Sequence, residues 1–287
     1  MRSSLSEGLL SSTVLVFQSA TMSTFISYAF KTQHPCKQEV NADMSANAPY
    51  YLTVFDGVGG VKNIGLKPED LSWDLRERTR HLLDKRSAQH TDRSEFDKEI
   101  LSAIGIPRGS KTAKGQWLHD LVVYAALQTT CLGSSTMALA SLMHGKMAYY
   151  CLGDCFIHIY RPLPLVEGLQ SLFETRVTAS TVRTIDGSET RIPKQFAVYR
   201  DEERELAARQ LLSQGDFGVV EVLKGDIIAM GSDGISDNLS TGAMKKIISE
   251  RYFSGDGPKV IAEVIAGDAL RAGLKPDDTT IIVAFVC

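Results

Sequence analysis

The sequence lacks the features that mark several large classes of protein. No apolar run reaches the length of about 18 residues that a membrane-spanning helix needs. The five cysteines form no Cys-x-x-Cys pair and no Cys/His zinc spacing, which favours reduced thiols over a disulfide framework. The 31 Lys and Arg residues nearly balance 34 Asp and Glu residues, and this net charge of −3 gives no general electrostatic reason to expect nucleic acid as a partner.

Several catalytic and nucleotide-binding motifs are also missing. There is no Gly-x-x-x-x-Gly-Lys-Ser/Thr phosphate loop and no Gly-x-Ser-x-Gly turn for a nucleophilic serine. Lys62 stands where a dinucleotide-binding fingerprint needs a third glycine after Gly57 and Gly59. Val58 stands where a haloacid-dehalogenase-type phosphatase needs its second aspartate. The six histidines form no His-x-His or His-x-x-x-His pair, which disfavours a zinc site built from histidines.

The sequence does contain an aromatic and β-branched run, residues 50–55, that ends abruptly at Asp56. Such a run is typical of a buried strand. The glycines that follow, at 57, 59 and 60, let the backbone turn tightly and expose its carbonyl groups. A carboxylate beside a bare carbonyl suits a hard divalent cation, which prefers oxygen ligands.

Three further acids lie beside predicted strands: Asp154 and Asp233 each follow one, and Asp277 precedes the last one. A single aspartate in such a place is usually a turn former. Four such acids together favour a cation site over four separate turns, because their like charges would repel one another unless cations lay among them. Carboxylates and water suit Mg²⁺ or Mn²⁺, whereas cysteine and histidine would suit Zn²⁺.

The remaining pattern predicts a single α+β domain over residues 1–287. Residues 9–30 are interpreted as its first strands; the alternative is that residues 1–27 are a weak targeting segment, since Arg2 and Glu7 are the only charges among the first 30 residues. A helix should open at 67–70. Helices are also predicted over 94–104, 116–128, 241–252 and 258–272; strands over 135–142, 147–152, 156–160 and 281–286; a strand pair over 219–222 and 226–230; and an irregular stretch over 162–200 with a turn at 186–187.

Five short motifs then carry a resemblance to a known family. They span residues 55–60, 132–136, 152–154, 231–238 and 275–280. In order and spacing they resemble the metal-dependent Ser/Thr protein phosphatases of type 2C (PPM), and the Asp-Gly-Val-Gly-Gly form resembles the short branch found in mitochondria and chloroplasts. The resemblance covers residues from about 28 to 287.

That resemblance implies a fold, a chemistry and a set of site residues. The implied fold is a four-layer α-β-β-α sandwich of two antiparallel sheets flanked by helices. The implied chemistry is hydrolysis of phosphoserine and phosphothreonine with two Mn²⁺ or Mg²⁺ ions, and a weaker third site is an option. Mapped by motif, Asp56 bridges the two ions, the Gly57 carbonyl binds one of them, and Asp56 and Asp233 are the catalytic residues. Asp233 and Asp277 complete the other ion's shell, and Asp154 resembles the family acid of the third site.

The match has gaps just before the first motif. The family has an adjacent acid pair on the preceding strand, whereas this chain offers Glu39 and Asp43, apart from each other. We favour Asp43 as the remaining ligand and keep Glu39 as a candidate. The family's general-acid histidine is replaced by Val58, and its phosphate-gripping arginine has no clear counterpart. The candidates for that role are Lys31, Lys37 and Lys62. Cys155 stands where the family usually has serine, and we interpret it as a packed strand residue.

The sequence therefore predicts a phosphoric monoester hydrolase, a metal-dependent protein-serine/threonine phosphatase. The expected partner is a phosphoserine or phosphothreonine protein, with no nucleic acid and no membrane span, and the chain is expected to be a monomer. The alternative is a catalytically weak relative that regulates a partner or binds phosphoproteins. The resemblance favours a mitochondrial or other organelle location, with the cytoplasm as the alternative.

Overall fold

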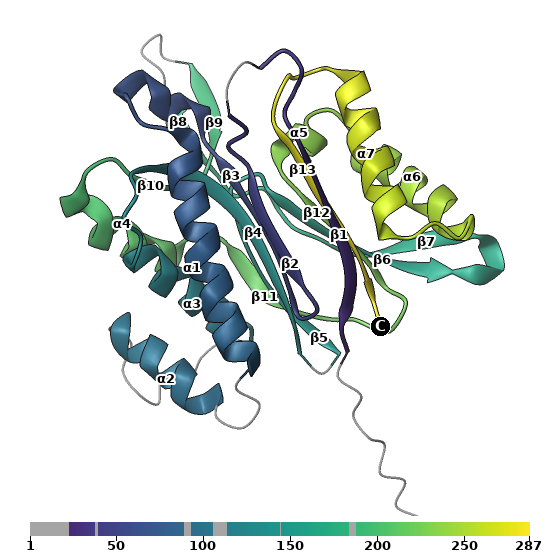
Figure 1. The fold of residues 1–287 in the computed structure, drawn as a ribbon, viewed down its shortest axis with the longest axis horizontal. Helices are drawn as coiled ribbons and strands as arrows, with labels where there is room; N and C mark the ends of the chain where they lie inside the picture. The colour runs from purple at the N-terminus through teal and green to yellow at the C-terminus, as the bar shows by residue number, and fades with distance from the viewer. Residues whose placement is uncertain (1–22, 38–39, 89–92, 106–113, 144, 184–187) are drawn as a thin grey trace, which may run out of the picture.

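The computed structural model describes residues 23–287 apart from 38–39, 89–92, 106–113, 144 and 184–187 (Figure 1). Its strands form two larger sheets and a separate hairpin, and every pairing is antiparallel. The first sheet has the order β1-β13-β12-β6-β7: Phe25–Thr32, Thr279–Val286, Ile227–Gly231, Phe156–Leu163 and Gly168–Glu174. The second has the order β11-β5-β4-β3-β2, with β10 also paired to β4: Asp216–Glu221, Lys146–Leu152, Gly133–Met143, Tyr51–Gly57, Met44–Ala48 and Phe196–Val198. The hairpin consists of β8 and β9, Ala179–Arg183 and Glu189–Pro193.

The two sheets pack face to face because their strands are apolar on both sides. Successive side chains of a strand point to opposite faces. In β3, Leu52 and Val54 therefore enter the core between the sheets, while Tyr51 and Phe55 face the helices. In β13, the even-numbered residues from 282 to 286 enter the core between the sheets, and 281 and 283 face the other helical layer. The fold thus has three apolar cores and four layers.

Helices cover both outer faces of the sheets (Figure 1). One layer packs on β3 and β4 and contains α1 (Pro68–Ala88), α2 (Arg93–Ala103), α3 (Gln116–Leu127) and α4 (Arg204–Gln210). In α1, Leu71, Leu75 and Leu82 form the buried stripe that contacts this sheet. The other layer contains α5 (Asp233–Ser236), α6 (Thr241–Phe253) and α7 (Pro258–Ala272), and packs on β13 and β12. Short 3-10 turns connect these elements: Gly59–Ile64 (η1), Pro164–Val166 (η2), Asp201–Glu203 (η3) and Leu211–Ser213 (η4).

The predicted α+β class, with two antiparallel sheets between helices, is confirmed. The five predicted helices are present, and Ser240 caps α6 by accepting a hydrogen bond from the backbone N–H of Ala243 at 3.2 Å. The first-strand interpretation is confirmed only from Phe25 on, because residues 1–22 lie outside the described part of the chain. Among the described residues, no helix combines the length and the apolar composition needed to cross a membrane.

Two predictions about strands are wrong. Residues 162–200 are not irregular, since they contain β7 to β10. Strand β9 is mostly exposed and β7 is only partly buried, so apolar alternation along these two is weak, and β10 is buried but only three residues long. The predicted turn at 186–187 lies outside the described residues. The segments 219–222 and 226–230 belong to β11 and β12, which do not pair: β11 pairs with β5, and β12 with β13 and β6. The turn between them crosses from one sheet to the other, and Gly225 supplies its left-handed backbone with φ 92°.

Candidate functional site

The acids predicted from the sequence meet at one end of the sheets. Asp56, Gly57, Asp154, Asp233 and Asp277 all line one cavity of about 590 Å³, which we call the carboxylate cavity. They come from four separate segments of the chain: β3, the turn after β5, the start of α5 and the loop before β13. The structure thus brings together residues that are up to 221 positions apart in the sequence, from 56 to 277.

Strand pairing explains why Asp233 and Asp277 are neighbours. Strands β12 and β13 run antiparallel, so the end of one lies beside the beginning of the other. Ser232 joins the end of β12 to the beginning of β13 by two hydrogen bonds. Its backbone N–H donates to the Thr280 carbonyl at 3.1 Å, and its hydroxyl accepts from the Thr280 N–H at 3.1 Å. Asp233 then starts α5 immediately after the strand.

Close backbone contacts explain two of the motif glycines. A Cβ atom on Gly57 would lie 2.3 Å from the Pro68 carbonyl oxygen, and one on Gly234 would lie 2.0 Å from the Asp278 carbonyl oxygen. Both distances are far below a normal contact. These glycines therefore allow β3 to approach the start of α1, and α5 to approach the acidic loop before β13.

The upstream candidate Asp43 is buried and lies near the acids, although it is not among the residues that line the carboxylate cavity. Its carboxylate accepts a hydrogen bond from the Ser232 hydroxyl at 2.7 Å. The other candidate, Glu39, lies outside the described residues.

Sequence reasoning missed Asp278 as a site residue, although the adjacent acids at 277 and 278 could have signalled it. Asp278 is buried and also lines the carboxylate cavity. One of its carboxylate oxygens, Oδ2, accepts from the Ala42 N–H at 3.0 Å, while Oδ1 is buried and has no hydrogen-bond partner among the described residues. Because a buried polar atom without a partner is costly, Oδ1 points to a ligand that the cavity can take.

The acids perturb one another's ionisation. Burial and then the negative charges of Asp43, Asp233, Asp154 and Asp277 raise the pKa of Asp56 well above its usual value. Burial raises the pKa of Asp43 to about 7 and that of Asp154 to about 6, and neighbouring carboxylates add to both shifts. Burial also raises the pKa of Asp233, against the opposing effect of a neighbouring lysine. The cluster therefore concentrates negative charge that a cation would stabilise.

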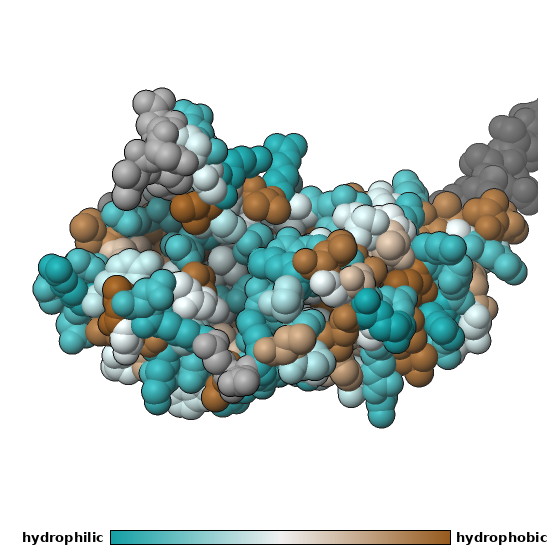
Figure 2. Space-filling model, turned by 90° about the horizontal axis from the view of Figure 1, so that it is seen from above, coloured by the Kyte–Doolittle hydropathy of each residue, from teal (hydrophilic) through white to brown (hydrophobic). Residues whose placement is uncertain are grey.

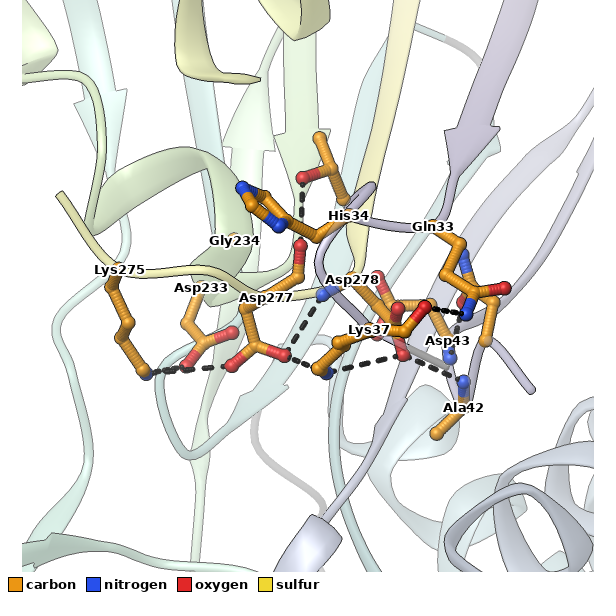
Figure 3. A network of polar contacts seen from close by, with 12 residues as sticks. Gln33, His34, Lys37, Ala42, Asp43, Asp233, Gly234, Lys275, Asp277 and Asp278 are labelled. Atoms are coloured by element: carbon orange, nitrogen blue, oxygen red, sulfur yellow. Dashed lines mark hydrogen bonds and ion pairs between the residues drawn. The ribbon is translucent and has the colours of Figure 1, made fainter. Parts of the chain in front are cut away.

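Two lysines supply positive charge within this cluster (Figure 3). Lys275 Nζ lies 2.6 Å from Asp233 Oδ2, 2.6 Å from Asp237 Oδ2 and 3.6 Å from Asp277 Oδ2. Lys37 Nζ contacts Asp277 Oδ1 closely and lies 3.4 Å from Asp278 Oδ2. Burial opposes ionisation of Asp277, but the hydrogen bond and charge of Lys37 outweigh it and lower the pKa of this carboxyl.

The three candidate phosphate-binding lysines differ in whether they line the carboxylate cavity. Lys37 and Lys62 line the carboxylate cavity. Lys31 does not line it, and its ammonium contacts Met44 Sδ at 3.7 Å instead.

Val58 and Cys155 are an apolar and a packed residue, as interpreted from the sequence, although Cys155 lies in the turn before β6 and not within a strand. Val58 lines the carboxylate cavity and offers no proton to a leaving group. Cys155 is buried, and its Sγ lies 3.3 Å from the Thr136 hydroxyl. Burial and then the charge of Asp56 raise its pKa well above the usual value, so the thiol is held protonated and packed.

Whether these residues fit a metal depends on both chemistry and arrangement. The donors are carboxylate and carbonyl oxygens, which suit Mg²⁺ or Mn²⁺. In the part of the chain that the structure describes, however, no group of three or more His, Cys, Asp or Glu side chains is arranged to hold a metal ion. The two lysine ammonium groups lie between the carboxylates there. The donor set and the unpaired Asp278 Oδ1 fit a divalent cation, and binding would require the lysines to move aside.

Comparison with known proteins gives partial relatives in plants. No family model matches the chain. Protein phosphatase 2C 24, as it is named, of Oryza sativa subsp. japonica is 25% identical over 193 residues, which cover 59% of this chain and 53% of that protein. Protein phosphatase 2C 26, as it is named, of Arabidopsis thaliana is 28% identical over 184 residues, covering 61% of this chain and 52% of that protein. The chain thus spans about half the length of the curated relatives it matches.

Solved structures share the fold over nearly the whole chain. The photosystem II phosphatase PBCP has a TM-score of 0.61 at 20% identity, covering 92% of this chain and 99% of that chain. Serine-threonine phosphatase 2C from Toxoplasma gondii also has a TM-score of 0.61, at 16% identity, covering 92% and 95%. The catalytic domain of PstP, in complex with 2 manganese ions, has a TM-score of 0.55 at 16% identity, covering 92% and 99%. At these identities the likeness establishes the architecture.

Proposed function

We propose that the chain belongs to the type 2C family of metal-dependent protein phosphatases and hydrolyses phosphoserine and phosphothreonine in proteins, with Mn²⁺ or Mg²⁺ as cofactor. The observation that carries this proposal is the convergence of Asp56, Asp154, Asp233 and Asp277 on one cavity. Carboxylates with raised pKa values gathered in a cavity are a feature of many functional sites.

We assign the metal-holding role to the residues mapped by motif. Asp56 would help to hold both ions, the Gly57 carbonyl would serve one of them, and Asp233 and Asp277 would serve the other. Asp154 would serve a third, weaker site. When bound, the ions would supply an activated water and neutralise the phosphoryl oxygens.

Other residues of the chain would prepare the cavity for a phosphate. Lys37 and Lys62 bring positive charge to its wall, where they can orient a phosphoryl group by charge-assisted hydrogen bonds. Val58 adds an apolar wall and leaves protonation of the leaving group to water. Asp43 and Glu39 remain the candidates for the last ligand of the second ion, and Asp43 is supported by its burial beside Ser232.

The substrate proteins, the single-domain organisation over residues 1–287, the monomeric state and the organelle-type branch with its location stay predictions. The alternative of a catalytically weak regulator is less favoured, because both plant relatives carry the name of protein phosphatases and all four mapped acids line the cavity.

The experiment measures phosphate release from p-nitrophenyl phosphate and from a phosphothreonine peptide, with and without Mn²⁺. Asp233→Ala should lose the metal-dependent turnover. Asp268→Ala, a matched change at an acid that pairs with Arg271 and does not line the carboxylate cavity, should keep it. Absence of Mn²⁺-dependent turnover in the wild type, or equal turnover in Asp233→Ala, would refute the proposal and favour the regulator.

A second comparison addresses the upstream ligand. Asp43→Asn and Glu39→Gln keep side-chain size and remove one charge each. Our assignment predicts that the Asp43 change raises the Mn²⁺ concentration needed for half-maximal turnover much more than the Glu39 change. The reverse order would assign the site to Glu39.

A further inference from the structure

A second cavity adjoins the carboxylate cavity and shares two of its wall residues, Val58 and Gln195. It has a volume of about 630 Å³, and we call it the side groove. One wall is formed by η1 and the residues that follow it, and the other by the segment that leaves β10. Any chain that places a phosphorylated side chain in the carboxylate cavity must continue over a neighbouring surface, and the side groove adjoins that cavity at Val58 and Gln195.

The lining of the side groove is mainly apolar and partly exposed. Val61 and Leu66 contribute to its wall, and Ile64 and Tyr199 are 59% and 43% exposed there. On the face seen in Figure 2, hydrophobic residues lie in separate patches within a largely hydrophilic surface. Exposed apolar side chains gathered around a concave surface indicate a binding site rather than random exposure.

One positive charge lies in this apolar lining. Arg200 is the only charged residue among the described residues that line the side groove. It is exposed, and no ion pair to it occurs among the described residues; the nearby acid Asp201 pairs with Arg204 at 2.6 Å instead. An arginine held at the edge of an apolar groove is complementary to a carboxylate on the ligand.

The groove wall is held in place by the core. In and around β10, Phe196 and Val198 are buried in the core between the second sheet and its helices, so Gln195, Ala197 and Tyr199 alternate toward the outside. On the opposite wall, Val61 is 3% exposed and anchors η1. A groove with anchored walls loses little conformational entropy when it binds an extended peptide.

We propose that the side groove binds the part of a phosphoprotein substrate that flanks the phosphorylated residue, and that it selects an apolar side chain next to an aspartate or glutamate. The apolar side chain covers Ile64 and Tyr199, and the acid pairs with Arg200. This proposal rests on the proposed phosphatase function and adds the sequence preference of that same site.

The test uses phosphothreonine peptides that carry one Leu and one Glu at varied positions around the phosphothreonine, with Glu→Gln and Glu→Lys versions of each. For the best Leu/Glu peptide, kcat/KM should fall about tenfold in Tyr199→Ser and about threefold in Arg200→Glu, relative to turnover of p-nitrophenyl phosphate by the same variant. The loss should appear in KM. Arg200→Glu should in turn prefer the Lys peptide to the Glu peptide.

Matched controls change side chains of the same kind away from the groove. Leu165→Ser alters a fully exposed leucine in the β6–β7 connection, and Arg271→Glu reverses a surface charge on α7; both should keep the wild-type peptide preference. Thermal melts check that each variant folds, and fluorescence anisotropy of labelled phosphopeptides measures binding without turnover.

The outcomes separate the two proposals. Suppose that the wild type hydrolyses p-nitrophenyl phosphate, but that wild type and Arg200→Glu each hydrolyse and bind the Glu, Gln and Lys peptides equally well. The side-groove proposal is then wrong, and the phosphatase proposal stands. If the wild type shows no metal-dependent turnover, the phosphatase proposal is wrong; equal binding of all peptides then overturns the groove as well.

Discussion

Asp43→Asn should stabilise the metal-free protein at pH 8 and change its stability little at pH 4. Asp43 is 1% exposed, and its pKa is raised from 3.8 to about 7 by burial and by Asp278 and Asp233. Between pH 3.8 and about pH 7, Asp43 holds a proton in the folded state that it releases in the unfolded state. The free energy of unfolding therefore falls as the pH rises through this range. A difference of about three pKa units at about 1.4 kcal/mol each corresponds to about 4 kcal/mol above pH 7.

Asparagine removes this cost because it carries no charge at any pH. It keeps the size of aspartate, and its carbonyl oxygen can still accept the hydrogen bond that Ser232 donates at 2.7 Å. The gain in unfolding free energy should therefore grow from near zero at pH 4 to about 4 kcal/mol at pH 8.

The assay is urea unfolding from pH 4 to pH 8 in the presence of a chelator, with Asp268→Asn as the matched control at a partly exposed acid. Mn²⁺ should then stabilise the wild type more strongly as pH rises, since carboxylates bind the ion in their ionised form. Unfolding curves of wild type and Asp43→Asn that keep a constant difference across this pH range would refute the electrostatic reasoning.

Two further predictions concern the contacts around the cavity. Gly234→Ala should destabilise the protein by about 1–3 kcal/mol, because the new Cβ would meet the Asp278 carbonyl oxygen. The control Gly242→Ala should be nearly neutral, because no atom lies within 4 Å of its new Cβ. Equal melting temperatures of the two variants would contradict the predicted clash. Lys275→Met should tighten Mn²⁺ binding severalfold in isothermal titration, since it removes the ammonium group 2.6 Å from Asp233 Oδ2; unchanged or weaker binding would show that the lysine does not compete with the ion.

Local sequence determined the elements that depend on local physics. The stripe of Leu71 and Leu75 with Pro68 at the helix start fixed α1, and the apolar run before Asp56 fixed β3, because side-chain periodicity and terminal residues act over a few positions. The motif acids were also readable, since Asp56, Asp154 and Asp233 stand at the end of an apolar run and Asp277 stands just before one. Strands partly or mostly exposed to solvent, such as β7 and β9, lack that periodicity and were missed.

Only the tertiary structure decided which segments meet. Sequence could not show that β11 and β12 belong to different sheets, because pairing is set by packing between distant segments. It could not show that Lys275 and Lys37 lie among the acids, because these contacts join residues that are far apart in the chain. Nor could it show that a buried oxygen of Asp278 has no partner within the described part of the chain, because that depends on the cavity around it. The side groove is also a feature that only the tertiary structure decides. Residues 58–66 and 195–200 face each other only after β3 and β10 have both paired with β4.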